Sequence, residues 1–158
     1  MAYANDTDDK ITSLFKTAYY SGDTGVKVLE FKYKKVTEDE YESLWEGFIK
    51  IKSCYKMSVY CQTHIIVTDK EGNPISQGNK GNNHIATLFN KDIKKLGINE
   101  KTSEIYFNKK DINVYFKENR EFAIYTDCGL NYDSNLLSKY PRDHKYWKQF
   151  FPKDNDCK

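Results

Sequence analysis

Residues 57–68 constrain the fold more than any other stretch of this chain, because their side chains alternate in character with a period of two. Such alternation predicts a β-strand with one buried face and one more polar face. The polar turn residues Asp-Lys-Glu-Gly-Asn-Pro follow directly at positions 69–74 and predict a chain reversal. The more polar face is expected to carry Ser58, Tyr60, Gln62, His64, Ile66 and Thr68.

Two longer segments show the spacing of apolar residues that is typical of an amphipathic helix. The first covers residues 11–19. The second follows a capping box at residues 37–40 and continues to residue 49, with Trp45 as an expected core anchor. Gly47 lies inside this second segment, where it would permit a close approach of a neighbouring element.

Shorter patterns complete the list of expected elements. A short helix is expected over residues 88–96, ended by Gly97, and another is expected after Pro141. Further strands are expected over residues 26–36, 104–108, 111–117 and 121–127, the last three joined as an antiparallel meander.

The order of these elements predicts an α+β fold, mainly an antiparallel sheet with two or three helices packed on one face. A chain of 158 residues without a linker or an internal repeat is expected to form a single domain over residues 1–158. Residues 1–6 are expected to be disordered and to include the remnant of a signal peptide.

The cysteines and the first residues both favour an exported protein. Residues 2–4, Ala-Tyr-Ala, match the small-x-small pattern that a signal peptidase recognises. Four cysteines form an even set that allows three connectivities. We expect Cys128 to pair with Cys157 and Cys54 with Cys61, in a periplasmic or secreted protein, because disulfides persist in oxidising compartments. The alternative is a cytosolic protein with free, buried cysteines.

The composition argues against several classes of partner. The 25 basic and 23 acidic residues nearly cancel, so no overall field attracts nucleic acid. No apolar run reaches the roughly 18 residues that a membrane-spanning helix needs. The sequence also carries no motif for a cofactor and no ligand spacing for a metal, so neither is expected.

A polar, glycine- and asparagine-rich stretch is the best candidate for a recognition loop. It covers residues 77–84 and does not have the spacing of a phosphate-binding P-loop. Loops held by a rigid sheet often carry function, although most connections of this kind are plain surface loops. The candidate binding residues are Gln77, Asn79, Lys80, Asn82, Asn83 and His84.

A catalytic reading remains as the alternative. Cys128 at a strand end could act as a nucleophile, with His84 as its base and Asp127 as the orienting carboxylate. Carboxylate-pair hydrolysis is a further option, but no spacing selects two residues from Glu30, Asp69, Asp127, Asp133 and Asp143.

The C-terminal segment is basic and aromatic. Residues 139–148 carry lysine and arginine between tyrosine and tryptophan, a composition that can contact nucleic acid or anionic headgroups. We instead expect Tyr146, Trp147, Phe150 and Phe151 to dock this tail onto the domain while its lysines stay solvated.

These features together are typical of bacterial binding modules, such as immunity proteins and enzyme inhibitors. We therefore expect a non-enzymatic, exported binding protein that occludes a secreted effector enzyme or toxin through a protein–protein surface. The alternative is a small secreted hydrolase or toxin domain that uses the Cys/His or carboxylate residues named above.

Overall fold

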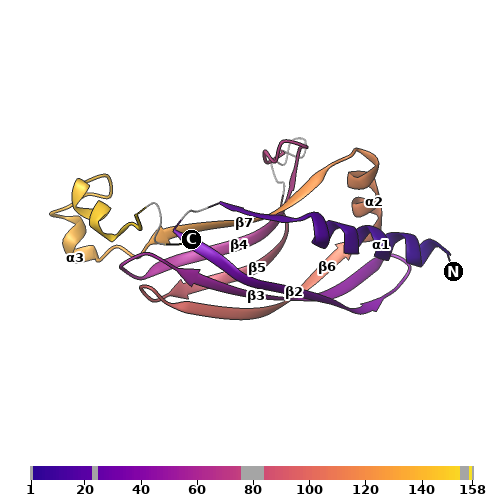
Figure 1. Ribbon diagram of the computed structural model, residues 1–158, viewed down its shortest axis with the longest axis horizontal. Helices are drawn as coiled ribbons and strands as arrows, with labels where there is room; N and C mark the ends of the chain where they lie inside the picture. Colours follow the sequence, from indigo (N-terminus) through magenta and orange to yellow (C-terminus); the bar gives the residue numbers. More distant parts are fainter. Residues whose placement is uncertain (1, 23–24, 76–83, 154–156, 158) are drawn as a thin grey trace.

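The computed structural model describes residues 2–22, 25–75, 84–153 and 157, and these form two sheets with helices at the edges and ends. The fold is α+β, as the sequence predicts, and it is elongated along the strand direction (Figure 1). Residues 2–6, expected to be disordered, belong to the first helix, α1 (Ala2–Thr17).

One sheet contains four strands in the order β1 (Tyr19–Gly22), β7 (Glu121–Leu130), β4 (Val59–Thr68) and β5 (His84–Ile93). The predicted strand β4 lies inside this sheet and pairs antiparallel with both β5 and β7, whereas the short β1 runs parallel to β7. We call this sheet A. The expected turn after β4 is confirmed, since the Asp69 carboxylate accepts hydrogen bonds from the backbone N–H groups of Glu71 and Asn73.

The other sheet, sheet B, contains three antiparallel strands in the order β2, β3, β6. These strands cover Val26–Glu38, Glu42–Ser53 and Ile98–Asn108. Sheet B joins sheet A through the turn between β5 and β6, where Ser53 donates its backbone N–H to the carbonyl of Gly97. The expected meander of the last three strands is wrong, because β6 pairs with β3 and β7 pairs with β4 and β1.

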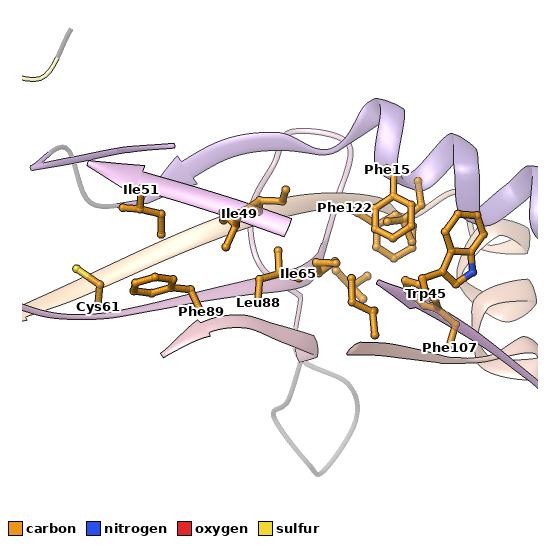
Figure 2. Packing of buried hydrophobic residues seen from close by; sticks show 14 of the residues in the cluster. Phe15, Trp45, Ile49, Ile51, Cys61, Ile65, Leu88, Phe89, Phe107 and Phe122 are labelled. Atoms are coloured by element: carbon orange, nitrogen blue, oxygen red, sulfur yellow. The ribbon is translucent and has the colours of Figure 1, made fainter. Parts of the chain in front are cut away.

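The core lies between the two sheets and under α1, as Figure 2 shows. Phe15 of α1 stacks on Tyr33 at a centroid distance of 4.4 Å and meets Trp45 at 5.4 Å. Trp45 is 5% exposed, which confirms its expected role as a core anchor. Gly47 permits the expected close approach, because a Cβ there would lie 2.7 Å from Cδ1 of Ile105.

The helix expected over residues 37–49 is wrong: this segment contains a hairpin turn and most of β3. The Asp39 carboxylate accepts from the backbone N–H groups of Tyr41 and Glu42, each at 2.7 Å, and so closes a turn instead of starting a helix. Trp45 and Ile49 are four residues apart, and this spacing places them on one face of either a helix or a strand. Pairing with β2 on one side and β6 on the other selects the strand.

Two other expected elements have the wrong type. The segment expected as a short helix, residues 88–96, contains the end of β5, whereas the segment expected as a strand is the helix α2 (Lys109–Lys117). The side chain of Asn108 caps α2 by accepting from the backbone N–H of Asp111 at 3.1 Å. Ile112 and Tyr115 then follow at helical spacing and pack on the core.

The C-terminal segment forms a small lobe at the end of the molecule opposite α2, with α3 (Ser134–Leu137) and the 3-10 helix η2 (Lys145–Phe150) (Figure 1). Trp147 is 2% exposed and meets Tyr132 edge to face at 4.7 Å. Phe151 meets Tyr55 at 5.9 Å, and the backbone N–H of Lys56 donates to Phe150. The aromatic side chains therefore dock the tail, as expected.

Both disulfides exist, but the expected pairing is wrong. Cys61 and Cys128 are directly opposed in the β4–β7 ladder, with their Cα atoms 4.1 Å apart, and they bond to each other. Cys157 instead bonds to Cys54, which follows β3, at a Cα distance of 5.6 Å. Strand register decides the pairing, because cysteines opposed in a ladder already have the required separation.

Candidate functional site

The candidate site is the outer face of sheet A, on the side opposite the core. Directly opposed residues in an antiparallel ladder point to the same side of the sheet. The Cys61–Cys128 disulfide and the Thr63–Thr126 hydroxyl contact at 3.1 Å mark the inner side. The alternate positions face outward, and we call them the histidine face: Tyr60, Gln62, His64 from β4, His84, Thr87, Asn90, Asp92 from β5, and Tyr125, Asp127 from β7.

His64 lies in the middle of this face, paired with Thr87 on one side and Tyr125 on the other. Its Nδ1 atom is 3.2 Å from the Thr87 hydroxyl oxygen, and Nε2 of His84 is 2.9 Å from the same oxygen. The two imidazole rings are 4.9 Å apart between centroids and nearly perpendicular, at 73°. Two ring nitrogens on neighbouring strands therefore point at one hydroxyl group.

The surroundings of His64 favour its neutral form. Partial burial lowers the pKa of this imidazole below its usual value, and the neighbouring His84 lowers it further. The Asp127 carboxylate on the flanking strand acts in the opposite direction and raises the pKa, but it is the smallest of the three effects. His64 is therefore an uncharged, partly exposed group at neutral pH.

The composition of the histidine face differs from that of the outer side of sheet B. Among the outward positions in the paired rows of β4, β5 and β7, none is lysine or arginine, and Glu121, opposite Thr68, is the single glutamate. Tyr60 and Tyr125 are 38% and 37% exposed there. The outer side of sheet B instead carries ion pairs, Glu30–Lys32 at 2.7 Å and Lys34–Glu46 at 4.0 Å. Exposed tyrosine with few lysine and glutamate residues is typical of protein interfaces.

The structure brings part of the sequence-predicted site together. His84 begins β5 and Asp127 lies on β7, so the two residues flank His64 on the same face. Cys128 does not join them, because its side chain points to the inner side and is bonded to Cys61. The proposed Cys128–His84–Asp127 nucleophilic site is therefore wrong, since a disulfide sulfur carries no thiol to activate. Gln77, Asn79, Lys80, Asn82 and Asn83 lie outside the described residues.

Three of the other candidate carboxylates take structural roles. Glu30 pairs with Lys32, Asp69 closes the turn after β4, and Asp133 caps α3 through the backbone N–H of Asn135 at 2.8 Å. The described residues contain no group of three or more His, Cys, Asp or Glu side chains that could hold a metal ion. Among the described helices, none has the length and apolarity needed to cross a membrane.

A hollow lies at the opposite end of sheet B from the C-terminal lobe, between the β2–β3 turn and β6. It encloses about 310 Å³ and is lined by Thr37, Glu38, Asp39, Glu42, Leu44 and Tyr106. The negative charge of Glu104, with a smaller contribution from Glu42, raises the pKa of the Tyr106 phenol. Lys109 and Lys35 both bind Glu38, so the charge of that carboxylate is already balanced within the protein.

Sequence reasoning missed the central place of His64 in the candidate site. The alternation of β4 already groups Tyr60, Gln62 and His64 on one face. It does not reveal which residues of other strands lie beside them. The pairing of β4 with β5 and β7 supplies that information. The β4–β5 pairing has a bulge between Thr63 and His64, which no local pattern indicates.

Comparison with known proteins adds little. No family model matches the chain, and no curated protein matches it. One similar solved structure is the X-ray structure of Northeast Structural Genomics Consortium target SoR45, with 21% sequence identity and a TM-score of 0.34. The match covers 54% of this chain and 64% of that chain. A likeness at this level carries no conclusion about function.

Proposed function

We propose that the protein is an exported, non-enzymatic binding protein whose histidine face docks on a protein partner. The observation that carries the proposal is the exposure of Tyr60 and Tyr125 on a face that also presents His64 and whose paired outward positions include no lysine or arginine. Tyrosine supplies a large contact area together with a hydroxyl group, and it is common among residues that dominate binding energy.

The structure behind this face supports binding without rearrangement. The Cys61–Cys128 disulfide joins β4 to β7 directly beneath the outward row of Gln62 and Asp127. The ladder from β5 through β4 to β7 continues on both sides of His64. A rigid surface loses little conformational entropy on association, which favours affinity.

The segment singled out in the sequence connects to this face. Residues 77–83 directly precede His84 in the chain, and His84 is the first residue of β5. We include Gln77, Asn79, Lys80, Asn82 and Asn83 in the proposed binding surface on this ground.

The two disulfides support an address outside the reducing cytosol. They favour a periplasmic or secreted protein, because disulfides persist in oxidising compartments. In such a compartment, the role that fits is an inhibitor or immunity protein that occludes a secreted enzyme or toxin.

Affinity capture from an extract of exported proteins of the source organism tests this proposal. We expect the wild-type protein to capture one exported enzyme and to inhibit it when both are purified. The Y60A/Y125A double variant should bind that enzyme at least about tenfold more weakly, because hot-spot side chains each contribute about 1 kcal/mol or more.

Tyr41→Ala is the matched control, since Tyr41 is 70% exposed and lies on the β2–β3 turn of sheet B, outside the paired rows of sheet A. It should bind like the wild type. Capture of no exported enzyme, or equal loss of binding in the control and the double variant, would contradict the proposal.

A further inference from the structure

We infer that His64 and His84 form a binding site for a divalent transition-metal ion such as Zn²⁺. The inference rests on their geometry and is independent of the proposed protein partner. The two imidazoles come from adjacent strands, and a nitrogen of each points at the same Thr87 oxygen, at 3.2 Å and 2.9 Å. Imidazole nitrogen is a ligand that zinc, copper and nickel all accept.

The spacing of the rings suits a shared metal ion. A zinc–nitrogen bond of about 2.0–2.1 Å places the metal about 3.2 Å from the centre of the ligating ring. Two rings at the observed centroid distance of 4.9 Å would then subtend roughly 100° at a common metal, close to the tetrahedral angle.

Metal binding requires a change in which ring nitrogens of His64 and His84 carry hydrogen. The Thr87 hydroxyl has one hydrogen, so it can donate to only one of the two facing nitrogens. The other facing nitrogen must then be protonated and donate its hydrogen to the Thr87 oxygen. Metal binding needs both facing nitrogens without hydrogen. One ring therefore moves its proton to its opposite nitrogen and remains neutral, while the Thr87 hydroxyl turns away.

The electrostatic surroundings favour a cation at this position. Burial and the neighbouring imidazole keep His64 in the neutral form that can bind metal, so the site does not depend on high pH. The carboxylate of Asp127 acts on His64 from the flanking strand and offsets added positive charge. The paired rows of this face carry no lysine or arginine that would repel the ion.

Two protein ligands leave the remaining coordination positions to water or to a group from another molecule. The described residues provide no third His, Cys, Asp or Glu with ligand geometry, so the site is open and the bound metal exchanges readily. The sequence predicts no metal because it has no local ligand spacing, whereas His64 and His84, 20 residues apart, come together only through the pairing of β4 with β5.

Calorimetric titration of the full, untagged and metal-stripped chain with Zn²⁺ at pH 7.5 tests the inference. We expect one zinc ion per chain, with affinity at least about tenfold lower in H64Q and in H84Q, because a single imidazole loses the chelate advantage.

The third histidine provides the control. H144Q should retain wild-type affinity, because His144 caps η2 in the C-terminal lobe. Mg²⁺, which prefers oxygen ligands, should not bind. Absence of binding up to 1 mM zinc, or unchanged affinity in H64Q, would overturn the inference.

A measurement on the wild-type chain covers the case in which a variant fails to fold. In ¹H–¹⁵N spectra of the histidine rings, zinc should shift the signals of His64 and His84 and leave those of His144 in place. Shifts at His144 alone, or at none of the three rings, would overturn the inference. Because the titrant is zinc alone, failure here leaves the proposed protein partner untouched, and the reverse also holds.

Discussion

His64 shows how one side chain can couple stability to pH. Its pKa is lowered in the folded protein, first by burial and then by His84, so the folded state binds fewer protons than the unfolded state in mildly acidic solution. The free energy of unfolding then rises with pH in that range. The contribution of His64 is fully present above its unfolded pKa of about 6.5 and is lost as the pH falls below it.

We therefore expect H64Q to be less sensitive to acid than the wild type. Going from pH 7.5 to pH 5, the wild type should lose stability relative to H64Q, because the partly buried His64 ring takes up a proton more readily in the unfolded state than in the folded state. Urea unfolding at several pH values measures the difference. If the free energy of unfolding changed with pH equally in the two proteins, His64 would have the same pKa in the folded and unfolded states, which would contradict the prediction.

Gly25 is a second position where one residue matters. A Cβ atom at Gly25 would overlap the ring of Tyr55, which is itself 6% exposed and packed against Phe151. The carbonyl of Gly25 also accepts a hydrogen bond from the backbone N–H of Cys54 at 2.8 Å, so the backbone there is held in place.

Gly25→Ala should destabilise the protein by about 1–3 kcal/mol, the usual effect of overpacking. Gly129→Ala is the matched control, because a Cβ there meets nothing within 4 Å, and it should change stability by less than about 0.5 kcal/mol. Chemical denaturation of both variants measures the difference. Equal stability of the two variants would mean that Tyr55 moves aside without cost.

At the scale of elements, the sequence predicts an element correctly where a single periodicity explains it. Strand β4 and helix α1 follow from alternation and from helical spacing, respectively. The sequence does not predict strand β5, because Leu88 and Phe89 are adjacent and both buried, which conflicts with simple alternation. A bulge in the ladder with β4 explains this, and a bulge depends on a partner strand that local sequence does not specify.

The same reasoning explains how much of the site could be predicted. Alternation places His64 beside Tyr60 and Gln62. The polar, glycine- and asparagine-rich segment that ends at His84 marks His84 as a candidate binding residue. The contact between His64 and His84 through Thr87 depends on the register of β5 against β4. Register is fixed by packing over the whole sheet, so residues distant in sequence meet without a local signal.

Helix α2 offers a test at this scale, since the sequence pattern alone favoured a strand. Asn108→Ala removes the side-chain oxygen that caps α2 and should lower stability by about 1 kcal/mol. Lys110→Ala, at an exposed position inside the same helix, should change stability by less than about 0.5 kcal/mol, because both residues are good helix formers. Thermal unfolding compares the two variants. An unchanged midpoint for Asn108→Ala would mean that tertiary contacts alone hold this helix.

At the scale of the whole molecule, the two disulfides connect parts that are far apart in the chain. The bridges span sequence separations of 67 and 103 residues. The entropy of closing such loops corresponds to about 4 and about 5 kcal/mol of stabilisation. Each value is a large part of the 5–15 kcal/mol by which domains are typically stable.

We expect C61A/C128A and C54A/C157A to be less stable than the wild type by about 2–5 kcal/mol each. Non-reducing peptide mapping should recover the linked pairs 54–157 and 61–128. Denaturation midpoints of the two double variants then compare the bridges. Recovery of peptides linked as 54–61 or 128–157 would contradict the pairing described above.

The positions of the two bridges have a consequence for survival among proteases. Cys54 and Cys61 both lie in the first half of the chain, and both of their partners lie in the second half. A single cut anywhere between Cys61 and Cys128 therefore yields two fragments that remain joined at two places. Such a nicked molecule keeps its mass until it is reduced, and β4 stays fastened to β7 beneath the histidine face.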